Sequence, residues 1–138
     1  MANIKLSEFV PEVKEALDKA LAEHLTKTQG KLAKSNPVDS GRMASSWFIS
    51  QNQPELGARP EGWAESGANR VEISEYPANA IEFDGTWYIS NNLPYSERVA
   101  LDPKWSKGGA GGTAWYTSIV NQQEADFNKS ATKFLRQV

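Results

Sequence analysis

The sequence predicts an α+β domain in which a small antiparallel β-sheet packs against two long helices, one N-terminal and one C-terminal, with one or two short helices between them. Two segments with helical apolar spacing, residues 7–34 and 114–136, flank a middle region of short β-prone runs bounded by Gly, Pro and Asp-Gly. The 138 residues suit a single domain that spans residues 1–138.

The first helix is predicted over residues 7–34, with Ser7 as its N-cap and Asn36-Pro37 ending it. Its apolar stripe follows helical spacing and consists of Val13, Leu17, Leu21, Leu25 and Leu32. The single histidine, His24, neighbours this stripe. We expect His24 to be an exposed or half-buried helix residue rather than a metal ligand.

Residues 37–47, with the sequence PVDSGRMASSW, form the most distinctive segment. Asp39 or Ser40 can cap a short helix over residues 41–45. Arg42 can pair with Asp39 or with the carbonyl groups at the end of a neighbouring helix. Two interpretations of Arg42 stay open: a structural pair that fixes the entry into the next strand, or an ion pair between subunits.

Three or four antiparallel strands are predicted in the middle of the chain. The β-prone runs are residues 47–50, 71–74, 80–83 and 86–91. Asp84-Gly85 separates the last two runs and predicts a hairpin, because a type I′ turn needs positive φ at both central residues.

Two extended loops are predicted, at residues 52–69 and 103–113, because both are rich in Gly or Pro and lack periodicity. A large aromatic side chain on such a loop is a candidate anchor for a partner, although Trp63 can equally fold back onto its own domain. The predicted interface residues are Trp63, Trp105, Lys104, Lys107 and Arg42.

The C-terminal third of the chain is predicted to be helical. A short helix covers residues 96–101 and stops at Asp102-Pro103. A second long helix covers residues 114–136, with Thr113 as its N-cap and an irregular apolar face.

The composition excludes several kinds of chemistry. The chain has no Cys and one His, which excludes a disulfide framework, a thiolate nucleophile and a two-His metal site. The glycines at residues 108–112 match neither a phosphate-binding loop nor a dinucleotide fingerprint. We therefore predict a protein that is not an enzyme, with no catalytic residues, cofactor or metal ligands. No apolar run is long enough to span a membrane.

The net charge of −2 conceals an uneven distribution. Residues 1–35 carry six basic and five acidic side chains, residues 36–103 carry four and ten, and residues 104–138 carry five and two. A DNA-gripping surface would show clustered Lys and Arg, which the acidic middle does not. The distribution suits solvated faces or charge-complementary contacts between copies of the chain.

Two segments carry a family resemblance. Residues 37–47 resemble the Pro-Val-Asp-Thr-Gly-Arg-Leu-x-x-Ser-Trp segment of small tail-completion or neck proteins of tailed double-stranded DNA bacteriophages. Residues 88–95, YISNNLPY, are similar to the Tyr/Val-x-Asn-Asn-x-Pro-Tyr-Ala segment of that family, and the order of predicted elements also matches. The motif positions expected to define the fold are Pro37, Asp39, Gly41, Trp47, Asn91, Pro94 and Tyr95.

The resemblance implies a structural virion protein that forms a homo-oligomeric ring, commonly a hexamer, in the phage neck between the head-side connector and the tail. Its implied partners are copies of itself and adjacent neck and tail proteins, with genomic DNA passing through the lumen without specific binding, and no membrane. Such a protein is made in the host cytoplasm and ends in the virion. Acidic side chains would face the lumen and repel phosphates, namely Glu55, Glu61, Glu65 and Glu72.

Other functions remain as alternatives. A tail terminator or another minor head–tail component would also assemble as a ring. A protein from a different class would bind nucleic acid through Lys104, Trp105 and Lys107.

Overall fold

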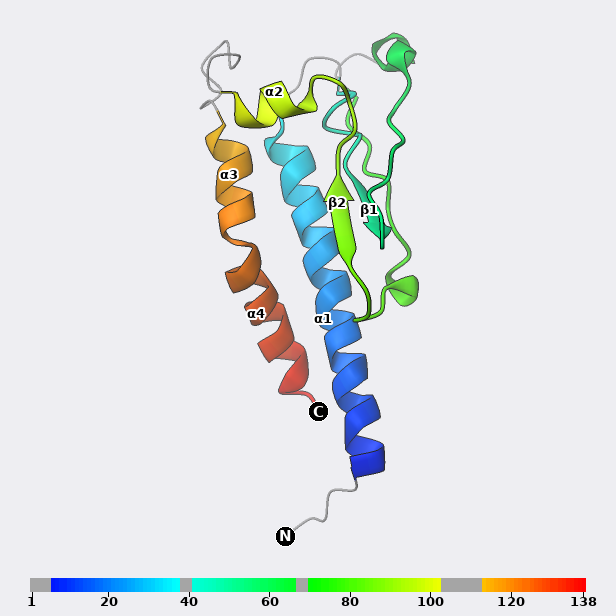
Figure 1. Cartoon of the computed structure of the whole chain (residues 1–138), viewed down its shortest axis with the longest axis vertical. Coiled ribbons are helices and arrows are strands. Elements are labelled where there is room, and N and C mark those ends of the chain that lie inside the picture. Colours follow the sequence, from blue (N-terminus) through cyan, green and yellow to red (C-terminus); the bar gives the residue numbers. More distant parts are fainter. Residues whose placement is uncertain (1–5, 38–40, 67–69, 103–112) are drawn as a thin grey trace.

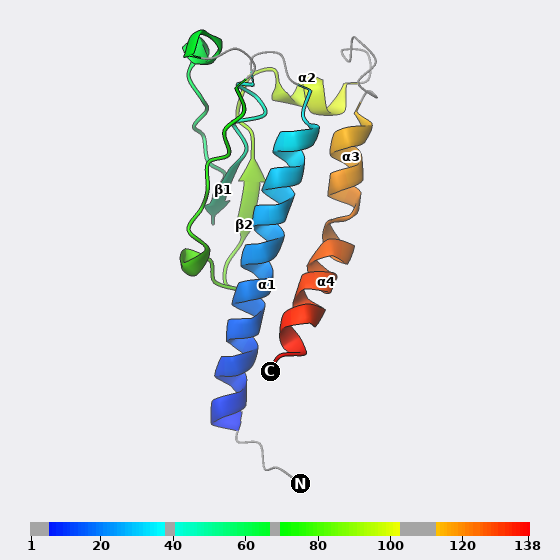
Figure 2. The ribbon, with the colours of Figure 1, turned by 180° about the vertical axis from the view of Figure 1, so that it is seen from behind.

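The computed structural model describes residues 6–37, 41–66, 70–102 and 113–138. Within these residues the chain has the predicted α+β architecture. Helix α1 (Leu6–Ser35) runs through the middle, with α3 (Ala114–Asn121) and α4 (Gln123–Leu135) on one side and a two-stranded sheet on the other (Figures 1 and 2). The short helix α2 (Ser96–Leu101) crosses the end of the molecule at which α1 finishes.

Helix α1 confirms the first predicted helix, but it is buried on two faces instead of one. Leu25 and Leu32 of the predicted stripe are buried. On the neighbouring face Ala16 and Ala20 are buried as well, and their small side chains let α4 pack closely. His24 is also buried on this face, because α4 covers it, so the expectation of an exposed or half-buried histidine is wrong.

The sheet contains two strands within the described residues, where three or four were expected. Strand β1 (Phe48–Gln51) pairs antiparallel with β2 (Trp87–Ser90), which confirms the first and last predicted strands. Residues 71–74 and 80–83 are not strands, so those two predictions are wrong. The predicted loop at residues 52–69 includes a 3-10 segment, η1 (Glu61–Ser66).

The predicted hairpin at Asp84-Gly85 is wrong too. Trp87 lies opposite Gln51 of β1 and does not pair back onto the residues before the turn. A 3-10 turn, η2 (Ala78–Ala80), interrupts the run, and Ile81 after it is buried in the core. Burial of this side chain and pairing with a distant strand therefore override the local turn signal, although Gly85 does have a positive φ of 66°.

The C-terminal region is helical as predicted, with one break. Helix α2 matches the prediction for residues 96–101. The single helix expected over residues 114–136 is two helices that meet at Gln122, whose ψ is 0°. Thr113 lies at the N-cap position of α3, but its side chain makes no capping hydrogen bond. The break lets α3 contact α2 while α4 follows α1.

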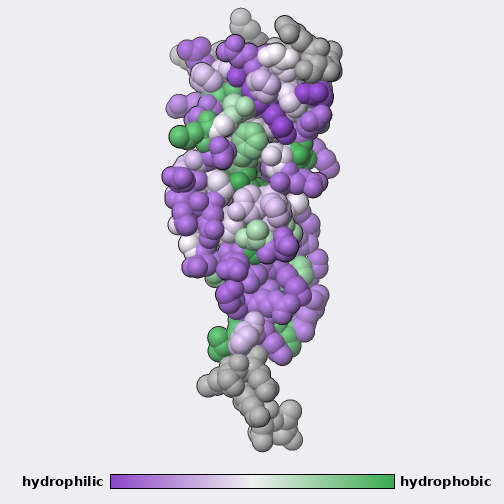
Figure 3. Space-filling view, turned by 90° about the vertical axis from the view of Figure 1, so that its right-hand side faces the viewer, coloured by the Kyte–Doolittle hydropathy of each residue, from purple (hydrophilic) through white to green (hydrophobic). Residues whose placement is uncertain are grey.

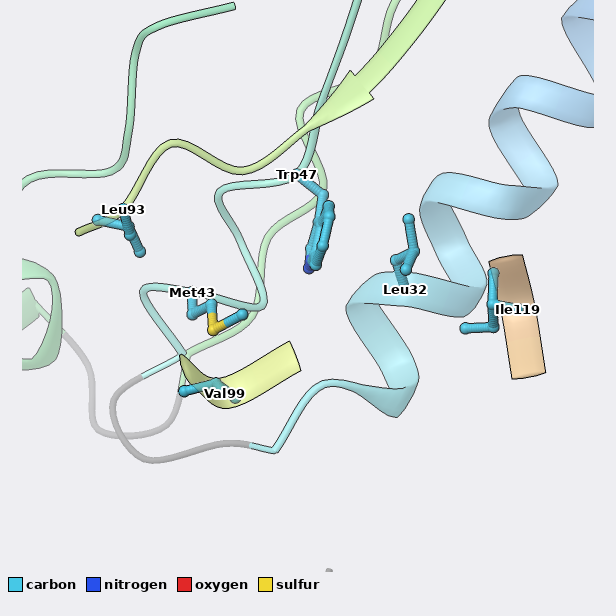
Figure 4. Close-up of a cluster of buried hydrophobic side chains, with 6 residues drawn as sticks. All are labelled: Leu32, Met43, Trp47, Leu93, Val99 and Ile119. Atoms are coloured by element: carbon cyan, nitrogen blue, oxygen red, sulfur yellow. The ribbon is translucent and has the colours of Figure 1, made fainter. Parts of the chain in front are cut away.

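The core consists of two clusters that share Ile89 of β2. The larger cluster lies where α1, α2, α3 and the segment before β1 converge, and its buried members are Leu32, Met43, Trp47, Leu93, Val99 and Ile119 (Figure 4). The smaller cluster lies between α1 and the sheet, and its buried members are Ala22, Leu25, Ile49 and Ile81.

Candidate functional site

The first motif forms a tight turn in place of the short helix predicted over residues 41–45. The N–H of Ser45 donates to the carbonyl of Gly41 at 2.9 Å, and the N–H of Ser46 donates to that of Met43 at 3.0 Å. Gly41 has a φ of 86°, and a Cβ atom there would lie 1.8 Å from the carbonyl oxygen of Arg70. This position therefore requires glycine. Asp39 and Ser40 lie outside the described residues.

Two buried serines of this turn organise the long loop that follows β1. Ser46 Oγ accepts the N–H of Arg59 at 3.0 Å and donates to the carbonyl of Arg42 at 2.6 Å. Ser45 Oγ accepts the N–H of Glu72 at 2.8 Å. The two hydroxyls bond backbone groups that a neighbouring strand would otherwise bond. The turn therefore holds the segments that contain Arg59 and Glu72 in place.

Trp63 folds back onto its own chain. The residue is 4% exposed, and the guanidinium carbons of Arg70 and Arg59 lie 3.6 and 5.0 Å from its ring centroid. Its Nε1 donates to the carbonyl of Arg70 at 2.7 Å. Cation–π contacts and this hydrogen bond satisfy the indole completely, so the prediction of Trp63 as an exposed interface anchor is wrong.

Arg42 has a structural contact within the chain. Its Nε donates to the carbonyl of Arg59 at 2.7 Å, and the side chain is half-buried. This contact fits the first interpretation of Arg42, in which it fixes the local chain path. The other three predicted interface residues, Lys104, Trp105 and Lys107, lie outside the described residues.

The two motifs meet in space. Asn91 Nδ2 donates to the carbonyl of Met43 at 2.8 Å, across 48 residues of sequence. Tyr95 is half-buried against the larger core cluster, whereas Pro94 is exposed on the turn into α2. At the other end of the first motif, Trp47 Nε1 donates to Asn36 Oδ1 at 3.0 Å. The two segments thus form one unit around the larger core cluster.

A hollow of about 730 Å³ opens between α1, α3 and the β2 side of the molecule. Leu25 and Thr28 of α1 form part of its wall, Trp87 comes from β2, and Tyr116 and Val120 come from α3. Residues of both core clusters line the hollow, which is mostly apolar and so suits an apolar side chain of a partner better than a polar substrate.

His24 of α1 lies at this hollow. Its ring packs edge-on against Phe127 with 5.6 Å between centroids. Burial lowers the pKa of His24, and a hydrogen bond with Gln123 opposes that shift only in part. The packing of His24 on Phe127 joins α1 to α4.

Gln29 is the most important residue that the sequence prediction missed. Its buried Nε2 donates to the carbonyls of Trp47 and Ser74, both at 2.8 Å, and so ties α1 to the segments on either side of the long loop. One signal was present in the sequence, because Gln29 stands four residues after Leu25, where the apolar stripe calls for another apolar residue.

In the described part of the chain, no three His, Asp or Glu side chains gather closely enough to hold a metal ion. None of the described helices has the length and apolar character that a membrane crossing requires. No family model, curated protein or solved structure matches the chain.

Proposed function

We propose that this chain is a structural virion protein that forms a ring in the neck of a tailed bacteriophage and joins the head-side connector to the tail. The observation that carries the proposal is the hydrogen bond between Asn91 and Met43, because it unites the two segments that resemble the neck family.

The ring contact is heterologous in this proposal, since a closed ring joins one side of a subunit to a different side of the next. Two exposed apolar residues suit the two sides. Leu56, which is 75% exposed, lies on the segment after β1 and is tied through its carbonyl to Asn92. Val120, which is 47% exposed, lies on α3 and lines the hollow between α1, α3 and the β2 side.

The distribution of charge also supports contact between these two sides of neighbouring subunits. Glu55 is exposed next to Leu56. Helix α4 carries the exposed Lys129, whereas its Lys133 is paired with Glu23 within the chain. Acidic and basic sides attract each other in a head-to-tail arrangement.

Genomic DNA passes through the lumen of the ring without specific binding in this proposal. Of the acidic side chains expected to face it, Glu55, Glu61 and Glu72 are exposed. The side chain of Glu65 lies outside the described ones. A ring of carboxylates would repel phosphates and so keep the DNA from adhering.

The decisive experiment is cryo-electron microscopy of virions of the phage that encodes this chain, together with particles made without it. The proposal predicts a ring, commonly of six copies, in the neck, and DNA-filled heads separate from complete tails when the chain is missing. A ring at the tail end alone would support the tail terminator instead. Absence of the chain from virions would overturn both.

A matched set of variants tests the ring surface. Leu56→Asp and Val120→Asp are each expected to abolish head–tail joining while leaving the monomer folded, because both side chains are exposed. Val10→Asp, on the projecting end of α1, is the control and should have no effect. Joined particles with both test variants would contradict the assigned surfaces.

A further inference from the structure

Residues 70–76 have the sequence of a strand but no strand partner. Their sequence, RVEISEY, alternates apolar and polar residues from Val71 to Ser74. The segment takes an extended path between η1 and η2 along the outer side of the sheet (Figure 1). Within the described residues, no backbone–backbone hydrogen bond joins it to another segment.

Side chains replace a neighbouring strand along one edge of this segment. The carbonyl of Arg70 accepts from Trp63 Nε1 at 2.7 Å, and that of Ser74 accepts from Gln29 Nε2 at 2.8 Å. Between them, the N–H of Glu72 donates to Ser45 Oγ at 2.8 Å. All of these bonds involve even-numbered residues, so a single edge of the segment faces the body of the protein.

The odd-numbered residues face the other way. In an extended chain, the N–H and C=O groups of successive residues point to opposite edges. Val71, Ile73 and Glu75 therefore direct their backbone groups outward, and no described residue bonds to them. The side chains of Val71 and Ile73 are 40% and 41% exposed. The result is a rigidly held β-edge with a free row of donors and acceptors.

We propose that this edge pairs antiparallel with the same edge of a second copy, across a twofold axis at Ile73. In this register Ile73 lies opposite Ile73 of the partner subunit, and Val71 lies opposite Glu75 of the partner subunit. The hydrogen-bonded pairs of an antiparallel ladder recur every second residue, so all of them fall on the odd-numbered residues that point outward. The free edge is thus complementary to itself.

The charged side chains of this edge are also compatible with a second copy of the chain. Glu75 faces Val71 of the partner subunit and Glu72 faces Ser74 of the partner subunit, so no two carboxylates lie directly opposite each other. Arg70 Nε lies 3.5 Å from Glu72 Oε1 and offsets its charge within each chain. On this side of the molecule, hydrophobic residues form a broken band between hydrophilic flanks (Figure 3).

This contact goes beyond the proposed ring. A twofold contact joins two subunits, or two rings face to face, and cannot close a ring by itself. It also uses the edge of residues 71–75, whereas the ring contact uses Leu56 and Val120. Failure of one contact therefore leaves the other intact.

Cysteine cross-linking tests the register, because the chain contains no Cys of its own. Opposed residues of a hydrogen-bonded pair have Cα atoms about 5.5 Å apart, within the range of a disulfide. Ile73→Cys is expected to give a covalent dimer on mild oxidation of the purified chain. Val71→Cys is the matched control and should stay mostly monomeric, because its two copies would lie about 13 Å apart along the ladder.

Sedimentation of the uncross-linked chain tests the pairing itself. We expect a monomer–dimer equilibrium that Ile73→Lys weakens about tenfold or more, since two ammonium groups would face each other on the axis. Ile73→Val keeps the pairing and controls for the loss of the isoleucine. Circular dichroism verifies that the variants fold.

Three outcomes would overturn the proposal. A wild-type chain that is monomeric at every concentration up to about millimolar would do so, even if a strand of a different protein later proved to occupy the edge. Equal cross-linking at residues 71 and 73 would reject the register. A dimer that Ile73→Lys leaves unchanged would place the contact elsewhere.

Discussion

The helical half of the molecule, α1 with α3 and α4, and the loop half, residues 41–66 and 70–77, satisfy their backbones in different ways. In the helical half the bonds lie within each helix, and the helices meet through small side chains and surface ion pairs such as Lys31–Asp126. In the loop half, side chains such as Ser45, Ser46 and Gln29 complete the bonds. Backbone groups of the loop half therefore depend on single side chains, whereas those within the helices bond one another.

The largest expected effect is a change in the free energy of unfolding, and it is tested by making the same Gly→Ala substitution in each half. Gly41→Ala should lower the free energy of unfolding by about 3 kcal/mol or more, because φ is positive and the new methyl group would meet the carbonyl of Arg70. Gly30→Ala in α1 should raise it by about 0.5–1 kcal/mol, because nothing lies within 4 Å and alanine favours helix. Urea unfolding measures both.

The comparison fails if the two variants shift the midpoint in the same direction. An unchanged slope of the transition would show that both effects act on stability and not on the compactness of the unfolded chain.

The next effect concerns the link between the halves. Gln29→Met keeps the side-chain volume but leaves the carbonyls of Trp47 and Ser74 unpaired, so we expect a loss of about 2–4 kcal/mol. Thr28→Val is the control from the same turn of α1, since its hydroxyl makes one long bond of 3.4 Å to Gln123, and should cost less than about 1 kcal/mol. Thermal unfolding followed by tryptophan fluorescence would measure the stability of both variants. Equal losses of stability would show that Gln29 does not link the two halves.

The smallest effect is a pH dependence confined to the helical half. Hydrogen bonds from Lys133 and Lys27, at 2.8 and 2.9 Å, lower the pKa of Glu23 from 4.5 to about 2. The stabilisation is complete above pH 4.5 and is lost as the pH falls toward about 2, because the unfolded chain takes up the proton first. Glu23→Gln should reduce the dependence of the free energy of unfolding on pH between about 2 and 4.5 in acid titrations of stability. Glu55→Gln, on an exposed loop, should leave that dependence unchanged.

The sequence predicted what periodicity controls and missed what distant contacts control. The stripe through Leu25 and Leu32 was enough for α1. β-prone residues marked β1 and β2, but they also marked residues 71–74 and 80–83, which are not strands. The Asp84-Gly85 hairpin failed because the burial of Ile81 and the pairing with β1 are not local properties. Trp63 failed for the same reason, since Arg59 and Arg70 enclose its ring only once the loop has folded.

The candidate site was predictable only in part. The motif positions were visible from the resemblance, and the meeting of Asn91 with Met43 follows from neither spacing nor propensity. The polar Gln29 in an apolar register was a usable signal, because a polar residue in a buried stripe must find partners. Ser45 and Ser46 carried no such signal, since serine is common in turns of every kind.

The break at Gln122 has a consequence for how the chain opens. Within α4 the buried side chain is Ser130, and the helix is held to α1 by the packing of Phe127 on His24 and by surface ion pairs, whereas α3 places Ile119 in the core. Because the helix is broken at Gln122, we expect α4 to detach from α1 more readily than α3 leaves the core. Amide protons of α4 should therefore exchange with solvent well before those of α3, which makes the C-terminal helix the element freest to rearrange when the chain meets a neighbour.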